Sequence, residues 1–367
     1  MSETIAVIGI GRMGLCFALN MERSGYRVVG VDANADYVRA INEKNIDSPE
    51  PQVRELLMQA KQFAATTDAA SALADAGVVF IAVPTPTSEQ GYDHAHLDLV
   101  IEKIIALGRQ DTRKHLVVSC TTIPGYCDKL AAQVELANYS LSYNPEFIAQ
   151  GSIIQNQLYP DQVLIGEADT AAGDVIENIY RRMTKNEPRI CRMNRLSAEI
   201  CKLATNCFLT TKIAFANAIG DLATVAGAEP EKILRAIGAD SRIGEKYLGY
   251  GFGFGGPCFP RDNRALGFFA DSVGYDLQLS KATDQSNNAH LDFMFGKFRE
   301  NHANGKPIVF DYVTYKPGVN ILEESQPLAL AVLLARAGKR VKIRETKAVI
   351  DEVKKNYGDL FIYEERN

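Results

Sequence analysis

Short apolar runs alternate with stretches of helical periodicity along the first half of the chain. Between the runs, segments such as LDLVIEKIIALG carry apolar residues at helical spacing. This alternation predicts an α/β fold with a mostly parallel, doubly wound sheet, whose ligand lies at the carboxyl ends of the strands. The strand-like runs are 4–9, 26–32, 78–85, 115–122, 139–145 and 161–167.

The pattern changes at Ser197. About thirty residues of helical pattern follow, with no interior Gly or Pro before Gly220, and a Ser-x-Glu sequence resembles a helix start. So long a helix predicts a spine between domains or a dimer interface, and a second helix follows it with a Pro near its first turn. From about Gly305 a β–α–β pattern begins again, followed by one helix and a short strand.

These changes predict three domains. A Rossmann domain that binds the dinucleotide spans 1–195, a central domain of long helices spans 196–300, and a short C-terminal α/β domain spans 301–367. We expect the central domain to carry the reactive residues and the contacts of a homodimer.

Composition narrows the class of protein. With 367 residues, 46% hydrophobic and 23% charged, the chain is typical of globular proteins. A net charge of −5 argues against nucleic acid or an anionic membrane as a partner, and we find neither a long apolar segment nor a signal peptide. Seven cysteines without a CxxC pair indicate reduced thiols in the cytoplasm. His94 and His96 lack partners at metal-ligand spacing, so we expect a solvated loop there and no metal.

The segment GIGRMG, residues 9–14, has the spacing of a dinucleotide-binding turn. Gly9 makes the turn, Gly11 lets the pyrophosphate approach, and Gly14 lets the helix pack on the strand, with Arg12 and Met13 between them. The next strand ends at Asp32, which is suited to the ribose hydroxyls and would repel a 2′-phosphate. The motif therefore predicts NAD rather than NADP.

A second informative segment is GFGFGGPCFPRD, residues 251–262. Its glycines let the backbone approach a ligand closely, and Cys258 follows them directly. A thiol there is either a small core residue or a nucleophile that reaches a bound substrate. The dinucleotide motif at the other end of the chain favours the nucleophile.

Taken together, the motifs resemble those of the UDP-glucose/GDP-mannose dehydrogenase family. The resemblance extends over the whole chain in family order, and its elements PEF, KxxxN and GGxCFPxD are specific in combination. The matching segments are GIGRMG (9–14), AVPTPT (82–87), CTTIPG (120–125), YNPEF (143–147), KLATN (202–206), 240–262 and YKP (315–317).

The resemblance implies that a nucleotide sugar's primary alcohol is oxidised to a carboxylate through two NAD-dependent hydride transfers, with UDP-glucose to UDP-glucuronate as the default reaction. Chemistry explains the cysteine, because an aldehyde loses a second hydride readily only after a nucleophile has added. A Cys258 thiolate would form a thiohemiacetal, whose oxidation leaves a thioester for water to hydrolyse.

The resemblance also assigns roles to single residues. Lys202 and Asn206, which share one helix face, would stabilise the oxyanions, although on their own they could be a solvated polar pair. Asp262 would orient water or act as a base, and Thr121 and Glu146 would hold a water. Glu146 follows Pro145, so its carboxylate could instead simply mark the start of a helix. Further contacts with nicotinamide or sugar would come from Val83, Thr85, Thr121, Glu146, Phe147, Phe252, Gly255 and Gly256.

Three departures from the family pattern concern the substrate. IAQGS (148–152) lacks the family's Arg-Glu pair, Glu323 replaces an Arg of the substrate loop, and the C-terminal domain is short. GDP-mannose or a UDP-N-acetylhexosamine are therefore alternative substrates. A catalytically idle, NAD-binding regulatory relative is the alternative of another class, whereas a β-hydroxyacid dehydrogenase would not need Cys258.

Overall fold

A computed structural model describes residues 4–88, 91–301 and 306–366. The packing of the chain divides it into two compact units, residues 1–202 and 203–367. Each unit is described by itself below. The three-domain division of the sequence remains a prediction.

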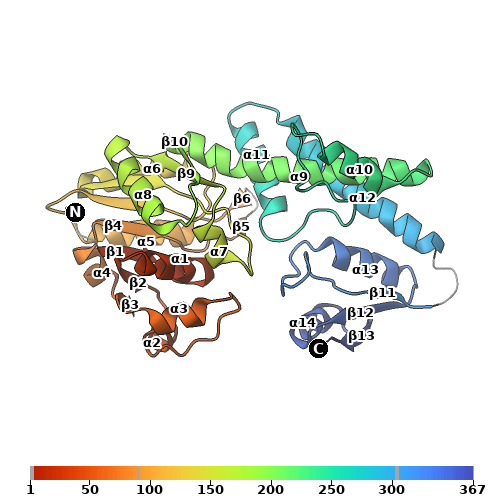
Figure 1. The fold of residues 1–367 in the computed structure, drawn as a ribbon, viewed down its shortest axis with the longest axis horizontal. Coiled ribbons are helices and arrows are strands. Elements are labelled where there is room, and N and C mark those ends of the chain that lie inside the picture. Colours follow the sequence, from red (N-terminus) through yellow and green to blue (C-terminus); the bar gives the residue numbers. More distant parts are fainter. Residues whose placement is uncertain (1–3, 89–90, 302–305, 367) are drawn as a thin grey trace. The chain divides into compact units, whose positions relative to one another are not determined.

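The first unit is built on an eight-stranded sheet (Figure 1). Its order is β10-β9-β8-β7-β4-β1-β2-β3, and all neighbours pair in parallel except β8 and β9, which pair antiparallel at Tyr143 and Gly166. This confirms the mostly parallel sheet. The strands are β1 (Thr4–Ile8), β2 (Arg27–Val31), β3 (Phe63–Thr66), β4 (Val78–Ile81), β7 (Lys114–Val118), β8 (Tyr139–Tyr143), β9 (Gln162–Glu167) and β10 (Arg189–Asn194).

Helices cover both faces of this sheet. Side chains alternate along β1, so that Ile5 and Val7 join one apolar core while Ala6 and Ile8 join another. The first core is closed by α1 (Arg12–Arg23), α2 (Ala35–Asn42), α3 (Val53–Gln59), α7 (Ile153–Leu158) and α8 (Thr170–Met183). The second is closed by α4 (Ala69–Asp75), α5 (Ala95–Ala106), α6 (Tyr126–Val134) and the short 3₁₀ helix η1 (Glu135–Ala137). The doubly wound Rossmann-like fold is thus confirmed.

Several strands are shorter than their apolar runs. β4 ends at Ile81 and β7 at Val118, so that AVPT and SCTT leave the sheet as loops at the carboxyl edge. Pro84 cannot donate to a central ladder, which is one reason why β4 ends early. A small hairpin of β5 (Thr87–Ser88) and β6 (Gly91–Tyr92) follows β4.

The predicted long helix is α9 (Arg195–Val225), which spans 31 residues. It begins two residues before Ser197, because the side chain of Asn194 accepts a hydrogen bond from the Ser197 amide at 2.8 Å. The Ser-x-Glu sequence is therefore not the cap of this helix. Glu199 is instead fully buried and serves another helix, as described below.

The second unit combines long helices with a small parallel sheet. After α9 come α10 (Pro230–Gly238), α11 (Phe259–Ser272) and α12 (Gln278–Asn301). The sheet has the order β11-β12-β13. Its elements are β11 (Ile308–Phe310), α13 (Gln326–Arg336), β12 (Val341–Glu345), α14 (Lys347–Tyr357) and β13 (Ile362–Glu365), around a core of their own that includes Phe310, Leu330 and Ile343.

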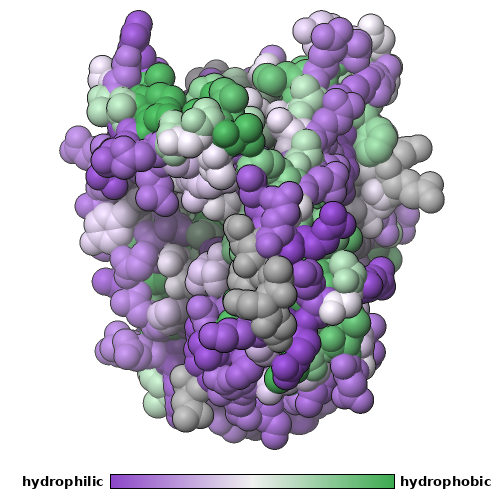
Figure 2. Space-filling model, turned by 90° about the vertical axis from the view of Figure 1, so that its right-hand side faces the viewer, coloured by the Kyte–Doolittle hydropathy of each residue, from purple (hydrophilic) through white to green (hydrophobic). Residues whose placement is uncertain are grey.

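Within the described parts of the chain, no helix is both long and apolar enough to cross a membrane. The face drawn in Figure 2 is largely hydrophilic, with apolar residues in scattered groups.

Candidate active site

The turn after β1 has the geometry of a dinucleotide-binding loop. Gly9 has a φ of 89°, and a Cβ there would lie 2.6 Å from the carbonyl oxygen of Ala82. A Cβ on Gly14 would collide with the Gly9 carbonyl, whereas one on Gly11 would meet nothing within 4 Å. Packing therefore requires the outer two glycines, while Gly11 faces open space that a pyrophosphate can enter.

The start of α1 suits an anion. Gly11 caps the helix without a side-chain hydrogen bond, and its first turn holds no acidic residue. The first amides and the positive end of the helix dipole therefore face no competing carboxylate within that turn. Arg12 extends from the same turn and binds the side chain of Gln150, with Glu50 at 4.0 Å, and Met13 is half-buried.

Asp32 lies just beyond the end of β2, beside β1 in the sheet. Its carboxylate accepts the Asn34 amide at 3.0 Å, and its own amide donates to the carbonyl of Thr66 at 3.1 Å. The acid is thus held at the carboxyl edge, where a ribose would bind. Val83 and Thr85 follow β4, the other neighbour of β1, and both are half-buried.

Glu50 binds the end of the loop that follows β8, just before α7 begins. It is 3% exposed and accepts the Gly151 amide at 2.9 Å on one oxygen and 3.0 Å on the other. The Ile153 amide also points at it, at 3.4 Å. A carboxylate from the loop before α3 thus satisfies amides at the start of α7.

The CTTIPG loop, which carries Thr121, is anchored in the same way by Glu199 of α9. One carboxylate oxygen accepts the Thr122 hydroxyl at 2.7 Å and the Cys127 amide at 2.9 Å, and the other accepts the Gly125 amide at 2.7 Å. These donors lie at the start of α6, so Glu199 caps a helix far away in the sequence. Thr121 itself is half-buried at the base of this loop.

His94 supports the CTTIPG loop from the other side, and the expectation of a solvated loop there was wrong. It is 6% exposed and stacks on Tyr126 with ring centroids 3.8 Å apart. Its Nε2 accepts the Ile123 amide at 3.4 Å, while the Tyr126 hydroxyl binds Asp98. Burial lowers the pKa of His94 to about 4, so the ring is neutral at physiological pH. His96, two residues on, is exposed.

Glu146 and Phe147 follow β8 and contact Lys202. The Lys202 ammonium donates to the Glu146 carbonyl at 2.7 Å and lies 4.3 Å from the centre of the Phe147 ring. Lys202 is only 7% exposed, so it is not part of a solvated polar stripe. Burial raises the pKa of the Glu146 carboxyl to about 7, against the opposing effects of a hydrogen bond from Tyr180 and the charge of Lys202.

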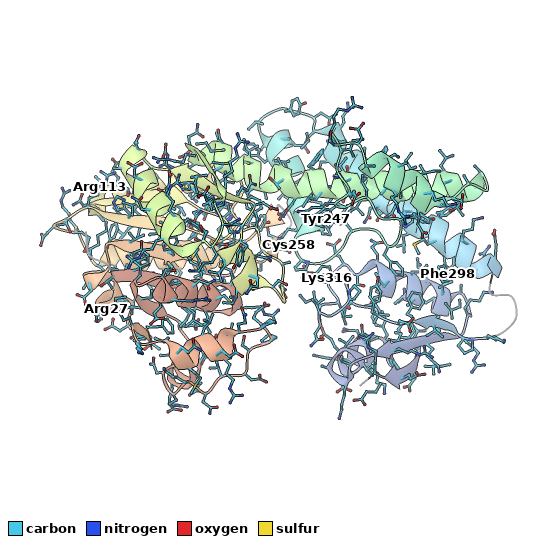
Figure 3. All side chains as sticks on the ribbon, viewed as in Figure 1. Arg27, Arg113, Tyr247, Cys258, Phe298 and Lys316 are labelled. Atoms are coloured by element: carbon cyan, nitrogen blue, oxygen red, sulfur yellow. The ribbon has the colours of Figure 1, made fainter. Side chains whose placement is uncertain are left out.

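In the second unit, the described residues bring Cys258 together with two of its predicted partners. Cys258 is exposed at the start of α11 (Figure 3). Asp262, in the first turn of the same helix, is 1% exposed, and its amide donates to the Cys258 carbonyl at 2.8 Å. Its carboxylate accepts the Asn206 amide group at 2.6 Å. A thiol at a helix N-terminus thus stands one turn from a buried carboxylate–amide pair.

Packing accounts for two glycines of the Cys258 loop. A Cβ on Gly255 would collide with the carbonyl of Glu324, and Gly256 has a φ of 82° with the Tyr315 ring 2.6 Å from its ideal Cβ. Phe252 packs edge-on against Tyr312, with centroids 5.9 Å apart. A role of Phe252, Gly255 and Gly256 in binding sugar stays a prediction.

Four residues that we did not predict hold this glycine-rich loop. Asn287 accepts the Phe254 amide at 2.9 Å and donates to the Phe254 carbonyl at 3.0 Å. His290 bridges the Gly251 carbonyl at 2.6 Å and a carboxylate oxygen of Asp221 at 2.8 Å. The fourth, Asn217, accepts the Gly251 amide at 3.1 Å. Each partner lies about thirty to seventy positions away in the sequence, so no local motif could reveal it.

The loop before α13 is acidic where the resemblance led us to expect an Arg. Glu323 is exposed, and its carbonyl accepts the Gly256 amide at 3.1 Å. Glu324 has a φ of 47° and forms a two-pronged ion pair with Arg264 at 2.7 and 2.9 Å. Arg264 also contacts Asp284 at 3.2 Å. The Glu324–Arg264 pair thus fastens this loop to α11.

Comparison with known proteins identifies close relatives. Models described as "UDP-glucose/GDP-mannose dehydrogenase family, NAD binding domain" and "central domain" match residues 3–184 and 196–289. A UDP-glucose 6-dehydrogenase of Pseudomonas aeruginosa is 33% identical over 360 residues, covering 94% of this chain and 79% of the relative. One from Bacillus subtilis is 30% identical over 356 residues, covering 94% and 80%.

Solved structures of nucleotide-sugar dehydrogenases resemble this chain as well. A UDP-glucose dehydrogenase from Pyrobaculum islandicum superposes with a TM-score of 0.88 at 31% identity, covering 100% of this chain and 86% of the other. A UDP-D-ManNAc dehydrogenase from Pyrococcus horikoshii gives a TM-score of 0.80 at 25% identity, covering 93% and 83%.

Proposed function

Because the chain belongs to the UDP-glucose/GDP-mannose dehydrogenase family, we propose that it oxidises the primary alcohol of a nucleotide sugar to a carboxylate in two NAD-dependent steps. The observation that carries this proposal is the exposed Cys258 thiol at the start of α11, one turn from the buried Asp262–Asn206 pair. A thiol that served only as packing would be expected in the core.

Gly11 and Asp32 would hold the cofactor through its pyrophosphate and its ribose. When bound, NAD accepts one hydride in each of the two oxidations. Val83, Thr85 and Thr121 follow β4 and β7, at the edge of the sheet where such folds bind nicotinamide. The open space at Gly11 fits this assignment.

In the first oxidation the alcohol loses a proton and a hydride and becomes an aldehyde. Lys202 and Asn206 are the groups proposed to stabilise the negative charge that develops on the oxygen. Both are buried, 7% and 9% exposed, where a hydrogen bond to an oxyanion is stronger than in water. Asp262, bound to Asn206, would orient that amide or take the proton.

In the second oxidation the Cys258 thiolate adds to the aldehyde carbon and forms a C–S bond. The resulting thiohemiacetal loses a hydride and becomes a thioester, and water then breaks the C–S bond to give the carboxylate and the free thiol. The balance is one sugar, one water and two NAD consumed. Glu146 would take a proton from that water, with Thr121 as a second hydrogen-bond partner, because a carboxylate with a pKa of about 7 is a suitable base near neutral pH.

UDP-glucose is the proposed substrate, since the Pseudomonas and Bacillus relatives are named for it. GDP-mannose and UDP-N-acetylhexosamines remain alternatives, because the exposed Glu323 offers no cation to a diphosphate.

The test incubates the protein with NAD and each nucleotide sugar. Two NADH per sugar consumed supports the proposal. NAD binding without turnover on any sugar would identify an idle relative instead. Cys258→Ser should abolish acid formation and leave NAD affinity unchanged. Acid formation by this variant at the wild-type rate would exclude the thioester route.

We also propose a homodimer that forms through α9. Phe208, Phe215 and Leu222 recur every seven residues and are 64%, 46% and 64% exposed. Residues at this spacing lie on one helix face, and a row of large apolar side chains in water favours a partner surface. None of the seven cysteines forms a disulfide in the described part of the chain, which fits a reducing cytoplasm.

A further inference from the structure

The hydroxyl group of Tyr180, on α8, lies between two hydrogen-bond acceptors. It is 2.7 Å from Oδ1 of Asn144 and 2.8 Å from Oε1 of Glu146. Tyr180 and Asn144 are buried, 3% and 1% exposed, and Glu146 is half-buried. A tyrosine hydroxyl has one proton and can donate to only one of the two at a time.

The orientation of the Asn144 amide is fixed by its other end. Its Nδ2 donates to the carbonyl of Leu164 at 2.8 Å, which leaves Oδ1 facing Tyr180. The Asn144 backbone is held as well, since its amide donates to the Val118 carbonyl at 2.8 Å. Asn144 therefore presents an acceptor, not a donor, to the hydroxyl.

The three side chains of Asn144, Glu146 and Tyr180 have two hydrogen-bonding states, which differ in whether Glu146 carries a proton. When Glu146 is neutral, its own proton can go to the Tyr180 oxygen while Tyr180 donates to Asn144, and all contacts are satisfied. When Glu146 is ionised, Tyr180 must turn its proton to the carboxylate, and the buried Asn144 oxygen then faces no donor from Tyr180. Ionisation thus exchanges two neutral hydrogen bonds for one charge-assisted bond, which is the stronger kind.

We propose that Tyr180 is a positioning residue that turns its hydroxyl proton between Asn144 and Glu146, so that this half-buried carboxyl can exist in both protonation states. The inference deepens the proposed function and rests on it, because Glu146 must gain and release a proton if it activates the water that hydrolyses the thioester. Without the Tyr180 donor, burial would keep the carboxyl neutral up to a higher pH.

The groups around the carboxyl agree with this assignment. Desolvation raises the pKa of Glu146 to about 7, while the hydrogen bond from Tyr180 and the charge of Lys202 oppose the rise. The Lys202 ammonium is itself engaged with the Glu146 carbonyl at 2.7 Å. The Tyr180 hydroxyl, in contrast, donates directly to the carboxyl group of Glu146.

The experiment measures titration of Glu146 in the full-length protein. Carboxyl ¹³C NMR of glutamate-labelled protein identifies the Glu146 signal by its loss in Glu146→Gln. Tyr180→Phe should move its midpoint upward by about one pH unit, since it removes a charge-assisted hydrogen bond. Asn144→Ala should move it downward, because Tyr180 then has only the carboxylate to bind. Opposite shifts from neighbouring substitutions are not expected of a merely structural role.

Tyr139→Phe is the matched control. Tyr139 lies on β8 in the same unit and is 1% exposed, and its buried hydroxyl has no hydrogen-bond partner in the described part of the chain. It should leave the Glu146 midpoint unchanged. An unchanged midpoint in Tyr180→Phe, or an equal shift in Tyr139→Phe, would overturn the inference.

Kinetics separates this inference from the proposed function. If the protein oxidises a nucleotide sugar, the acidic limb of kcat against pH should move upward in Tyr180→Phe while the KM for NAD stays constant. If no sugar is turned over, the proposed function fails, yet the NMR titration still decides whether Tyr180 sets the ionisation of Glu146.

Discussion

Glu199→Gln should loosen the CTTIPG loop with little change in shape. The carboxylate receives three donors, from Thr122, Gly125 and Cys127. In glutamine an NH₂ group replaces one of the two carboxylate oxygens. Because each of these oxygens accepts a backbone N–H, the NH₂ group faces another donor. One hydrogen bond is then lost, a buried donor is left without a partner, and the bonds that remain are no longer charge-assisted.

The magnitude follows from these contacts. A hydrogen bond to a charged group contributes about 1.5–3 kcal/mol and a neutral one about 0.5–1.5 kcal/mol, so the loss of one and the weakening of two cost about 3.5–6 kcal/mol. Burial raises the pKa of Glu199, which shows that its charge is itself penalised, and the neutral amide recovers part of that cost. We therefore expect a net loss of about 3 kcal/mol.

Differential scanning calorimetry measures the effect. NAD raises the transition of the unit that binds it, which identifies the relevant peak. For about 200 residues, 1 kcal/mol corresponds to roughly 2–4 °C, so the transition should fall by about 6–12 °C. Glu102→Gln, at an exposed position of α5, removes the same charge and should move it little. A fall no larger than that of Glu102→Gln would refute the capping role of Glu199.

Three further predictions concern pH, thiol reactivity and assembly. Because the folded protein raises the pKa of Glu146 from 4.5 to about 7, it loses stability as the pH rises through that interval. Glu146→Gln avoids this loss and should gain about 3 kcal/mol in the free energy of unfolding at about pH 8, but under about 1 kcal/mol near pH 5, by denaturant titration. Iodoacetamide should modify Cys258 well before the six less exposed thiols, as peptide mass spectrometry can record. Phe215→Glu should yield monomers in light scattering, and a dimer that persists would argue against assembly through α9.

The sequence predicted most of the fold because most strands are buried on both faces. β1, β4 and β8 are buried along their whole length. β1 and β4 read as nearly continuous apolar runs, whereas β8, YSLSY, alternates tyrosine and leucine with serine. The two strands of the eight-stranded sheet that we missed, β3 and β10, form its two edges. β10 reads RICRMN, half-exposed and interrupted by arginines, so its sequence carries no continuous apolar run.

The residues of the candidate site also fall into those that the sequence predicted and those that it did not. Gly9, Gly14 and Asp32 could be found because a turn and a strand end impose local spacing. Glu199 and Tyr180 could not, because their partners lie 34 to 77 positions away in the sequence and come close only through the fold. A buried glutamate on an apolar helix face was the one available signal, and its Ser-x-Glu context suggested a cap for the wrong helix.

The tertiary caps of Glu50 and Glu199 also bear on how this chain can change in evolution. Each carboxylate accepts hydrogen bonds from backbone amides of a segment more than seventy positions away in the sequence. A substitution in one segment therefore affects the structure of the other. Loss of either acid leaves these backbone N–H groups without their carboxylate acceptor, and a lineage that replaces the acid must rebuild the turn that carries those amides. Among homologues, substitutions at 50 should therefore accompany changes at 151–153, and those at 199 changes at 122–127.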